Sequence, residues 1–224
     1  MKRLIPSLAT LALLVALNVF LPRVTNPYYF QVLILVGINI VLAVSLNLIN
    51  GHTGQFSLGH AGFMAVGGYA AAVTSIQLSP WVPPALLPLV FLGSLLLGGL
   101  AAAATGLAVG VPSLRLRGDY LAIVSLGFGE IIRVVLQNME SVGGASGLKG
   151  IPKYTTLGWT FALAAITVYA IACLVNSTYG RGFIAVHDDE VAASAMGINP
   201  TRYKVTAFVV GAFFAGVAGG LYRS

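Results

Sequence analysis

Hydrophobic residues in this chain form long runs, with polar residues, prolines and charges concentrated between them. A helix rises about 1.5 Å per residue and needs roughly 20 apolar residues to cross the hydrocarbon core of a bilayer. The runs therefore predict about seven membrane spans, at Leu4 to Leu21, Phe30 to Ile49, Phe56 to Ile76, Ala85 to Val111, Tyr120 to Gln137, Trp159 to Asn176 and Val205 to Tyr222. This pattern indicates an all-α, polytopic membrane helix bundle forming a single domain over residues 1–224.

The overall composition agrees with a membrane location. Hydrophobic residues make up 58% of the chain and charged residues only 8%, with a mean hydropathy of +0.92, whereas soluble domains carry roughly 25% charged residues. The net charge of +6 comes from cations scattered in ones and twos beside apolar runs, which favours topology signals over nucleic-acid binding. The single cysteine, Cys173, offers neither an intramolecular disulfide nor a cysteine-based metal site.

The cations between the predicted spans bear on orientation. If the N-terminus is cytoplasmic, the inner connections carry Lys2, Arg3, Arg115, Arg117, Arg181, Arg202 and Lys204, and the outer ones carry Arg23, Lys149, Lys153 and Arg223. Seven against four agrees with the excess of Lys and Arg in cytoplasmic loops. The first apolar run lacks a small-residue cleavage site, so we expect a first membrane helix there rather than a cleaved signal peptide.

The stretch from Asn47 to Tyr69 is too rich in glycine and polar residues for an ordinary span. Glycines let a helix unwind or let backbones approach closely, and a membrane tolerates such irregularity only where protein or a polar cavity receives the exposed groups. We therefore predict a span broken near Gly51–Gly54. The residues expected to line a solute path, or else to pack the bundle, are Asn47, Asn50, Gln55, Ser57 and His60. A metal site at His52 and His60 has little support, because no carboxylate or cysteine lies near them in the sequence.

Glu130 and Arg133 are charged residues inside a predicted span. They are three positions apart and so share one face of a helix. Because charge within a membrane is costly, we expect the two side chains to face the bundle interior and to pair. An internal ion pair and a role in lining or gating a solute path are equally favoured.

Two connections are longer than simple turns. Residues 137–158 are rich in Gly and Ser, which indicates a flexible loop or a docking surface on the outer face. Residues 177–204 contain a predicted helix from about Asp188 to Met196, with acids at its start, Gly197 as its C-cap and Pro200 preventing its continuation. Such a helix either lies in a groove of a soluble partner or rests on the membrane as a connector.

Motifs of catalysis and nucleotide binding are absent from the sequence. It contains no HExxH, no GxSxG and no GxxxxGK[ST] phosphate loop. We therefore expect a transporter subunit rather than an enzyme, with no cofactor in this chain. If ATP powers transport, another subunit must supply its site.

Four stretches form a recognisable set: Asn47 to Tyr69 with its core GHTGQFSLGHAGF, Leu114 to Arg133 (LRLRGDYLAIVSLGFGEIIR), residues 143–148 (GGASGL) and Gly180 to Gly197 (GRGFIAVHDDEVAASAMG). In sequence and in order they resemble the LivM-type permease subunits of branched-chain amino acid ABC transporters. The resemblance implies an inner-membrane permease of a bacterium or archaeon. Its expected partners are a LivH-like second permease, two cytoplasmic ATPase subunits that bind ATP, and an extracytoplasmic binding protein for leucine, isoleucine or valine.

On this resemblance the inner connection is the loop that couples the permease to the ATPases. Its expected residues are Arg181, Asp188, Asp189, Glu190, Ala192, Ala193 and Gly197. Glu190 and Gly197 are seven positions apart, one more than is common in the family's EAA motif. LivM-type chains also continue beyond the equivalent of Leu221, so the resemblance predicts that this sequence is a fragment or a truncated product.

Two alternatives remain open at this stage. A secondary carrier or channel would use Glu130, Arg133 and the histidines as an ion relay and would not need ATP. A permease of the same family would instead carry urea, short amides or aromatic acids.

Overall fold

The computed structural model describes residues 27–113, 119–144, 147–148, 150 and 154–223. Six helices in these ranges are long and apolar enough to cross a membrane. They are α2 (Pro27–Asn50), α3 (His60–Leu78), α4 (Leu87–Ser113), α5 (Asp119–Asn138), α6 (Leu157–Val175) and α9 (Pro200–Arg223). Each coincides with a predicted span, and no strand occurs among the described residues. The all-α membrane bundle is therefore confirmed, while the predicted span Leu4 to Leu21 lies outside the described residues.

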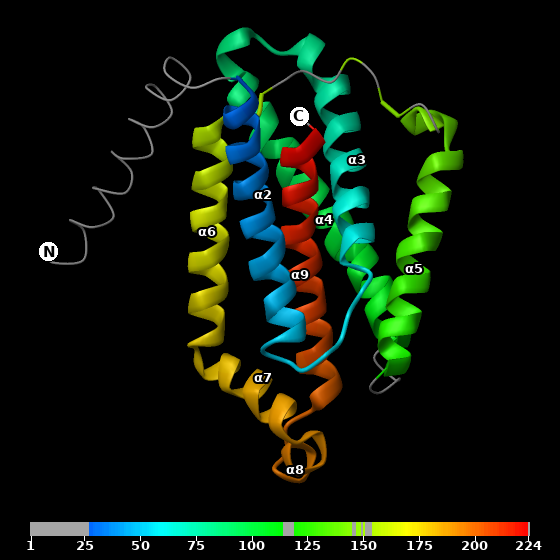
Figure 1. Ribbon diagram of the computed structural model, residues 1–224, viewed down its shortest axis with the longest axis vertical. Coiled ribbons are helices and arrows are strands. Elements are labelled where there is room, and N and C mark those ends of the chain that lie inside the picture. The colour runs from blue at the N-terminus through cyan, green and yellow to red at the C-terminus, as the bar shows by residue number, and fades with distance from the viewer. Residues whose placement is uncertain (1–26, 114–118, 145–146, 149, 151–153, 224) are drawn as a thin grey trace, which may run out of the picture.

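Shorter elements connect the long helices. Two 3-10 turns, Ser79–Trp81 and Pro84–Leu86, link α3 to α4, and a third, Glu140–Val142, follows α5. Two short helices, α7 (Thr178–Asp188) and α8 (Glu190–Ala195), link α6 to α9. Figure 1 shows α7 and α8 together at one end of the bundle, where α4 also ends and α5 begins.

Helix α9 is the centre of the bundle. It packs against α2, α3 and α4, while α5 stands at the edge and contacts mainly α3 (Figure 1). Within the most apolar stretch of each helix, 61% of the α9 residues are buried, against 17% in α5. Small residues permit this packing, since a Cβ added at Gly67 of α3 would overlap the backbone of Gly216 in α9.

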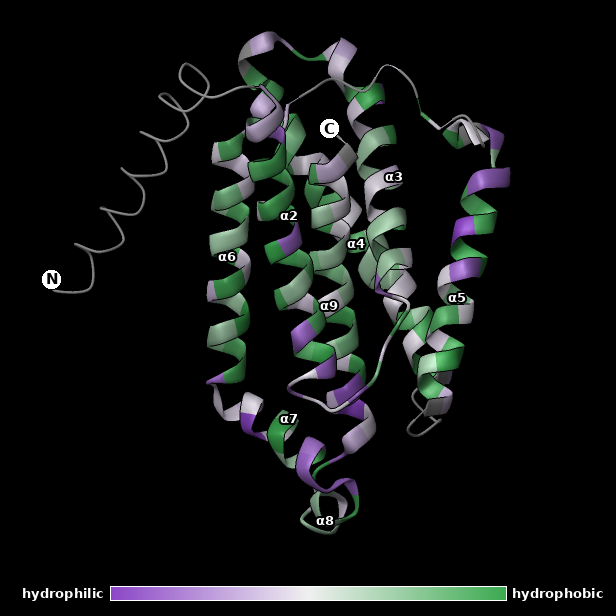
Figure 2. Cartoon of the chain, in the orientation of Figure 1, coloured by the Kyte–Doolittle hydropathy of each residue, from purple (hydrophilic) through white to green (hydrophobic). Residues whose placement is uncertain are grey.

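Hydropathy varies along the bundle. Hydrophobic residues cover most of the long helices, whereas hydrophilic residues gather in α7, just before α8 and at the start of α9, and recur in part of α5 (Figure 2). The end that contains α7 and α8 is therefore a polar end of the bundle, of the kind that meets water.

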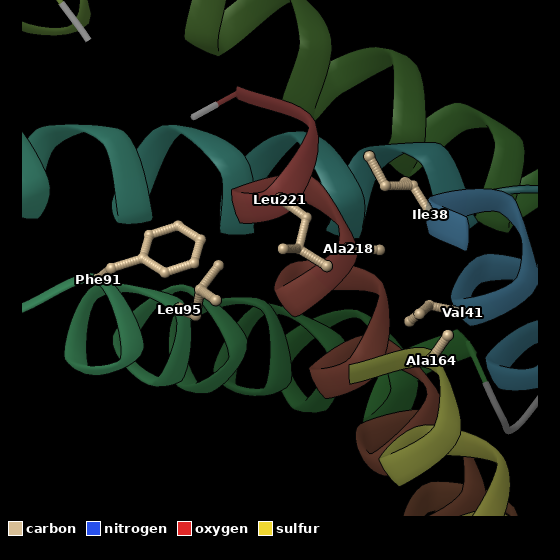
Figure 3. Close-up of a cluster of buried hydrophobic side chains, with 7 residues drawn as sticks. All are labelled: Ile38, Val41, Phe91, Leu95, Ala164, Ala218 and Leu221. Atoms are coloured by element: carbon tan, nitrogen blue, oxygen red, sulfur yellow. The ribbon is translucent and has the colours of Figure 1, made fainter. Parts of the chain in front are cut away.

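Buried apolar side chains join the helices in clusters. Figure 3 shows one that combines α2, α4, α6 and α9 through Ile38, Val41, Phe91, Leu95, Ala164, Ala218 and Leu221. A second cluster, nearer the polar end, includes Ile49, Phe63, Phe208 and Ala212. In a bilayer such clusters stabilise the bundle mainly by close packing, because lipid is as apolar as the side chains.

Two local predictions need correction. Residues 56–59 are not helical, so α3 begins at His60 rather than Phe56. The predicted helix from Asp188 to Met196 is instead the end of α7 followed by α8, because Asp189 has an extended backbone (φ −155°, ψ 110°) and separates the two.

Candidate functional site

Residues 51–59 form a non-helical linking segment between α2 and α3, as expected from their glycines. From position 53 onward, burial alternates: Thr53, Gln55 and Ser57 are buried, whereas Phe56 and Leu58 are 55% and 47% exposed. Alternation with a period of two is typical of stretched backbone. The polar side chains therefore point into the bundle and the apolar ones point outward, as suits a segment within a membrane.

The linking segment is held by hydrogen bonds to three helices. The Leu58 amide donates to the Ser125 hydroxyl of α5 (2.9 Å), and the Ser57 amide donates to the Asn50 side-chain oxygen of α2 (3.2 Å). The Gln55 side-chain nitrogen donates to the Lys204 carbonyl in α9 (3.4 Å). The segment therefore has a defined position between α2, α5 and α9.

Several buried polar atoms in this region lack a partner among the described residues. They are Gln55 Oε1, Ser57 Oγ and His60 Nδ1. His60 Nε2 lies 2.9 Å from Ser45 Oγ, and that hydroxyl donates to the Leu42 carbonyl (3.0 Å). We therefore assign the proton to His60 Nε2, which leaves Nδ1 as an acceptor. A buried polar atom without a partner costs about 1–3 kcal/mol, so this cluster is suited to binding water or a polar solute.

The predicted path residues are only partly brought together. Asn50, Gln55, Ser57 and His60 lie on or beside the linking segment. Asn47 is exposed near the end of α2, and its backbone carbonyl accepts from the backbone amides of Gly51 (2.8 Å) and His52 (3.1 Å).

Glu130 and Arg133 pair as predicted, with Arg133 Nε 2.9 Å from Glu130 Oε2. Their side chains are 56% and 61% exposed on α5, so they do not face the interior of the described bundle. They border a pocket of about 160 Å³ between α3 and α5, lined otherwise by Leu58, Ala61, Gly62, Ala65, Leu126 and Gly129. The expectation of an interior position was wrong because a single chain does not reveal which of its faces another protein covers.

Helix α7 is fixed to the start of α9 by aromatic side chains. The Tyr179 and Tyr203 rings stack with centroids 4.5 Å apart, and Phe183 meets both rings edge-on. The Tyr179 and Thr206 hydroxyls lie 3.1 Å apart. These contacts hold the first turns of α7 against the start of α9.

Helix α8 is short and capped at both ends. The Asp189 carboxylate accepts from the amides of Val191 (2.8 Å) and Ala192 (3.0 Å). At the other end Gly197 has a φ of +84°, and the Ile198 amide donates to the Ala193 carbonyl (3.0 Å). This is a Schellman motif, which confirms the predicted C-cap.

Two large apolar side chains, which we call the tip of α8, are exposed at the polar end of the bundle. Val191 is 68% exposed and Met196 84%. Of the predicted coupling residues, Ala193 is buried and Glu190 half-buried, and the exposed ones are Arg181, Asp188, Asp189, Ala192 and Gly197. The exposed surface can meet a partner, while the buried residues attach α8 to the bundle.

Comparison with known proteins decides the family. The family model described as "Branched-chain amino acid transport system / permease component" matches residues 28–224. The chain belongs to this family of permeases.

Curated relatives of this permease come from bacteria and an archaeon. The chain is 36% identical over 222 residues to the "High-affinity branched-chain amino acid transport system permease protein LivM" of Salmonella typhimurium, covering 84% of this chain and 50% of the relative. It is 34% identical to the Escherichia coli protein of the same name, covering 96% and 56%. It is 27% identical to a "Probable branched-chain amino acid transport permease protein LivM" of Methanocaldococcus jannaschii, covering 60% and 44%.

The permease chain spans about half the length of these relatives. No solved structure matches it. All three relatives are named as transport permeases rather than enzymes. Together with the six apolar helices, this identifies a multi-pass membrane protein.

Sequence reasoning missed several residues of the permease site. Lys204 was considered only as a topology charge, yet its ammonium group lies 2.7 Å from Glu190 Oε2 and is largely buried. Ser45 and Ser125 sit among apolar residues with no distinguishing pattern. Only the serine content of otherwise apolar runs could have indicated them.

Proposed function

We propose that this chain is the membrane-spanning permease subunit of an ABC importer that carries leucine, isoleucine, valine or related solutes across the inner membrane. Its family membership supports the solute class. The observation that carries the coupling role is the exposed apolar tip of α8, which is attached to the most buried helix of the bundle.

Two cytoplasmic ATPase subunits supply the nucleotide site in this proposal, since the sequence contains no phosphate-binding loop. The side chains of Val191 and Met196 lie in an ATPase groove, which removes exposed apolar surface from water. ATP binding moves α7 and α8, and the contacts of Tyr179 and Phe183 with Tyr203 transmit this movement to α9. In this arrangement the end that contains α7 and α8 is cytoplasmic. A cytoplasmic N-terminus is also part of the proposal. It rests on the distribution of Lys and Arg along the sequence, and most of those residues lie outside the described residues.

A LivH-like second permease covers the outer face of α3 and α5. Glu130 and Arg133 lie inside a span, where each charge facing lipid costs on the order of 2.5–3.5 kcal/mol. A protein interface with a polar solute path removes that cost. The pocket beside Gly62 and Gly129 lies on this face and offers such a path an apolar wall for a branched side chain.

The polar side chains on the buried side of the linking segment supply hydrogen-bonding groups to the same solute path. Gln55, Ser57 and His60 offer atoms without partners in the described chain, and Asn50 holds the segment beside them. Asn47 contributes at the cytoplasmic end. An extracytoplasmic binding protein delivers the solute to the opposite end of the bundle.

Reconstitution of the complete transporter into liposomes tests this proposal. With both permeases, the ATPases and the binding protein present, we expect leucine uptake that requires ATP on the ATPase side and is unaffected by collapse of ion gradients. Competition with isoleucine, valine, urea, short amides and aromatic acids identifies the solute class. Uptake driven by a proton or sodium gradient without any ATPase would refute the importer and support the ion-coupled carrier.

A further inference from the structure

Three contacts connect the loop that contains α7 and α8 to the linking segment. Lys204 Nζ lies 2.7 Å from Glu190 Oε2 at the start of α8, and the Lys204 carbonyl accepts from the Gln55 side chain (3.4 Å). At Gly54, an added Cβ would lie 2.9 Å from His187 Cδ2 at the end of α7. The loop therefore touches the linking segment directly as well as through α9.

The Glu190–Lys204 pair differs from the other ion pairs of the described chain. Its side chains are 12% exposed at Lys204 and 30% at Glu190, whereas both partners in Glu130–Arg133 and His187–Asp188 are 46% exposed or more. Removing one partner of a pair screened from water leaves an uncompensated charge, which costs far more than breaking an exposed pair. The pair therefore fixes α8 against the first turn of α9.

The contact at Gly54 is equally restrictive. Gly54 has a φ of +65°, a left-handed conformation that other residues adopt only with strain, and the His187 ring lies against it. A movement of the end of α7 must therefore displace Gly54 or separate the two.

We propose that Lys204 is a positioning residue for transport, which joins α8 to the linking segment so that both move as one unit. This inference rests on the proposed function, because it assumes that α8 receives the movement of an ATPase. Lys204 holds Glu190 through its ammonium group and Gln55 through its carbonyl, and Gln55 adjoins Ser57 on the buried side of the segment. Displacement of α8 thus shifts the polar side chains of the path through the first turn of α9 alone, without a movement of the rest of that helix.

The first experiment uses the complete transporter and compares four variants: Lys204→Met, Lys204→Arg, Glu190→Lys and the charge exchange Glu190→Lys/Lys204→Glu. We expect Lys204→Met to keep the ATPases bound and hydrolysing ATP but to lower leucine uptake per ATP about fivefold or more. Lys204→Arg keeps the charge and should retain most uptake per ATP. The charge exchange should recover uptake relative to Glu190→Lys alone.

Two results of that experiment would overturn the inference. One is an unchanged ratio of uptake to hydrolysis in Lys204→Met, which would make the pair merely structural. The other is a charge exchange that transports no better than Glu190→Lys, which would mean that Glu190 acts on the ATPase and not on Lys204.

A second experiment does not depend on the ATPases. Ser57→Cys, placed in a Cys173→Ala background because Cys173 is exposed, reports the exposure of the linking segment to a maleimide in membranes. Ser57 is 2% exposed, so labelling should be slow, and Lys204→Met should accelerate it about fivefold or more. Equal labelling rates with and without the Lys204→Met substitution would overturn the inference even if the importer proposal holds. If no ATPase binds the wild-type permease, the importer proposal fails while this comparison still decides the role of Lys204.

Discussion

The packing of α4 on α9 makes a quantitative prediction at Gly106. A Cβ added there would lie 2.6 Å from the Ala212 Cβ, whereas carbon atoms in contact are optimally about 3.5–4.0 Å apart. Gly106→Ala therefore requires α4 and α9 to separate locally by about 1 Å. Overpacking of this kind costs about 1–3 kcal/mol.

The same helix provides a matched control. Gly93 also lies in α4, and an added Cβ there meets nothing within 4 Å among the described residues. Replacing Gly by Ala raises helix propensity at both positions, so this contribution cancels when the unfolding free energies of the two variants are compared. We expect Gly106→Ala to be less stable than Gly93→Ala by about 1–3 kcal/mol.

Stability can be measured as thermal unfolding of the purified permease in mild detergent. The double variant Gly106→Ala/Ala212→Gly moves the methyl group from one helix to the other, so it should recover most of the lost stability. Equal stability of the Gly106→Ala and Gly93→Ala variants would refute the close packing of α4 on α9. Failure of Ala212→Gly to compensate would show that Gly106 acts through another contact.

Two further predictions concern the loop and the path. Ala193→Pro removes the amide that donates to the Asp189 carbonyl (2.9 Å) in α8. It should abolish ATPase co-purification and uptake without preventing membrane insertion. Wild-type uptake in this variant would contradict the docking role of α8. In Gly62→Leu the new Cβ would lie 3.1 Å from the Gly129 Cα, so the leucine side chain should fill the pocket between α3 and α5. We expect leucine uptake to fall about tenfold or more while ATPase binding persists. Unchanged uptake in Gly62→Leu would exclude the pocket from the solute path.

The long helices were predictable because a bilayer requires about 20 apolar residues for each span, and the sequence shows these runs directly. The break after α2 was predictable for a related reason. A stretch that contains Gly51, Gly54 and Gly59 among polar residues cannot sit as a regular helix in lipid.

The division between α7 and α8 was not predictable from the same reasoning. Asp189 could equally continue a helix or cap one, and only its extended backbone in the structure decides. Burial of Lys204 depends on Glu190, 14 positions away across a turn of the chain, and no local pattern records that contact. The exposed position of Glu130 and Arg133 depends on what packs against this chain, which its own sequence does not contain.

Site-directed cross-linking at Met196 tests the central claim most directly. Met196 directly follows α8 and is 84% exposed, and Trp81 ends the 3-10 turn after α3 and is 87% exposed, so the two positions make a matched pair for a photoreactive residue. Figure 1 shows α8 at one end of the bundle and the connection from α3 to α4 at the other. We predict that position 196 captures a subunit that also binds a radiolabelled ATP analogue, and that position 81 does not. Two results would contradict the role of α8 as the coupling element. One is equal capture of that subunit at both positions, and the other is capture at neither position while the complete complex transports leucine.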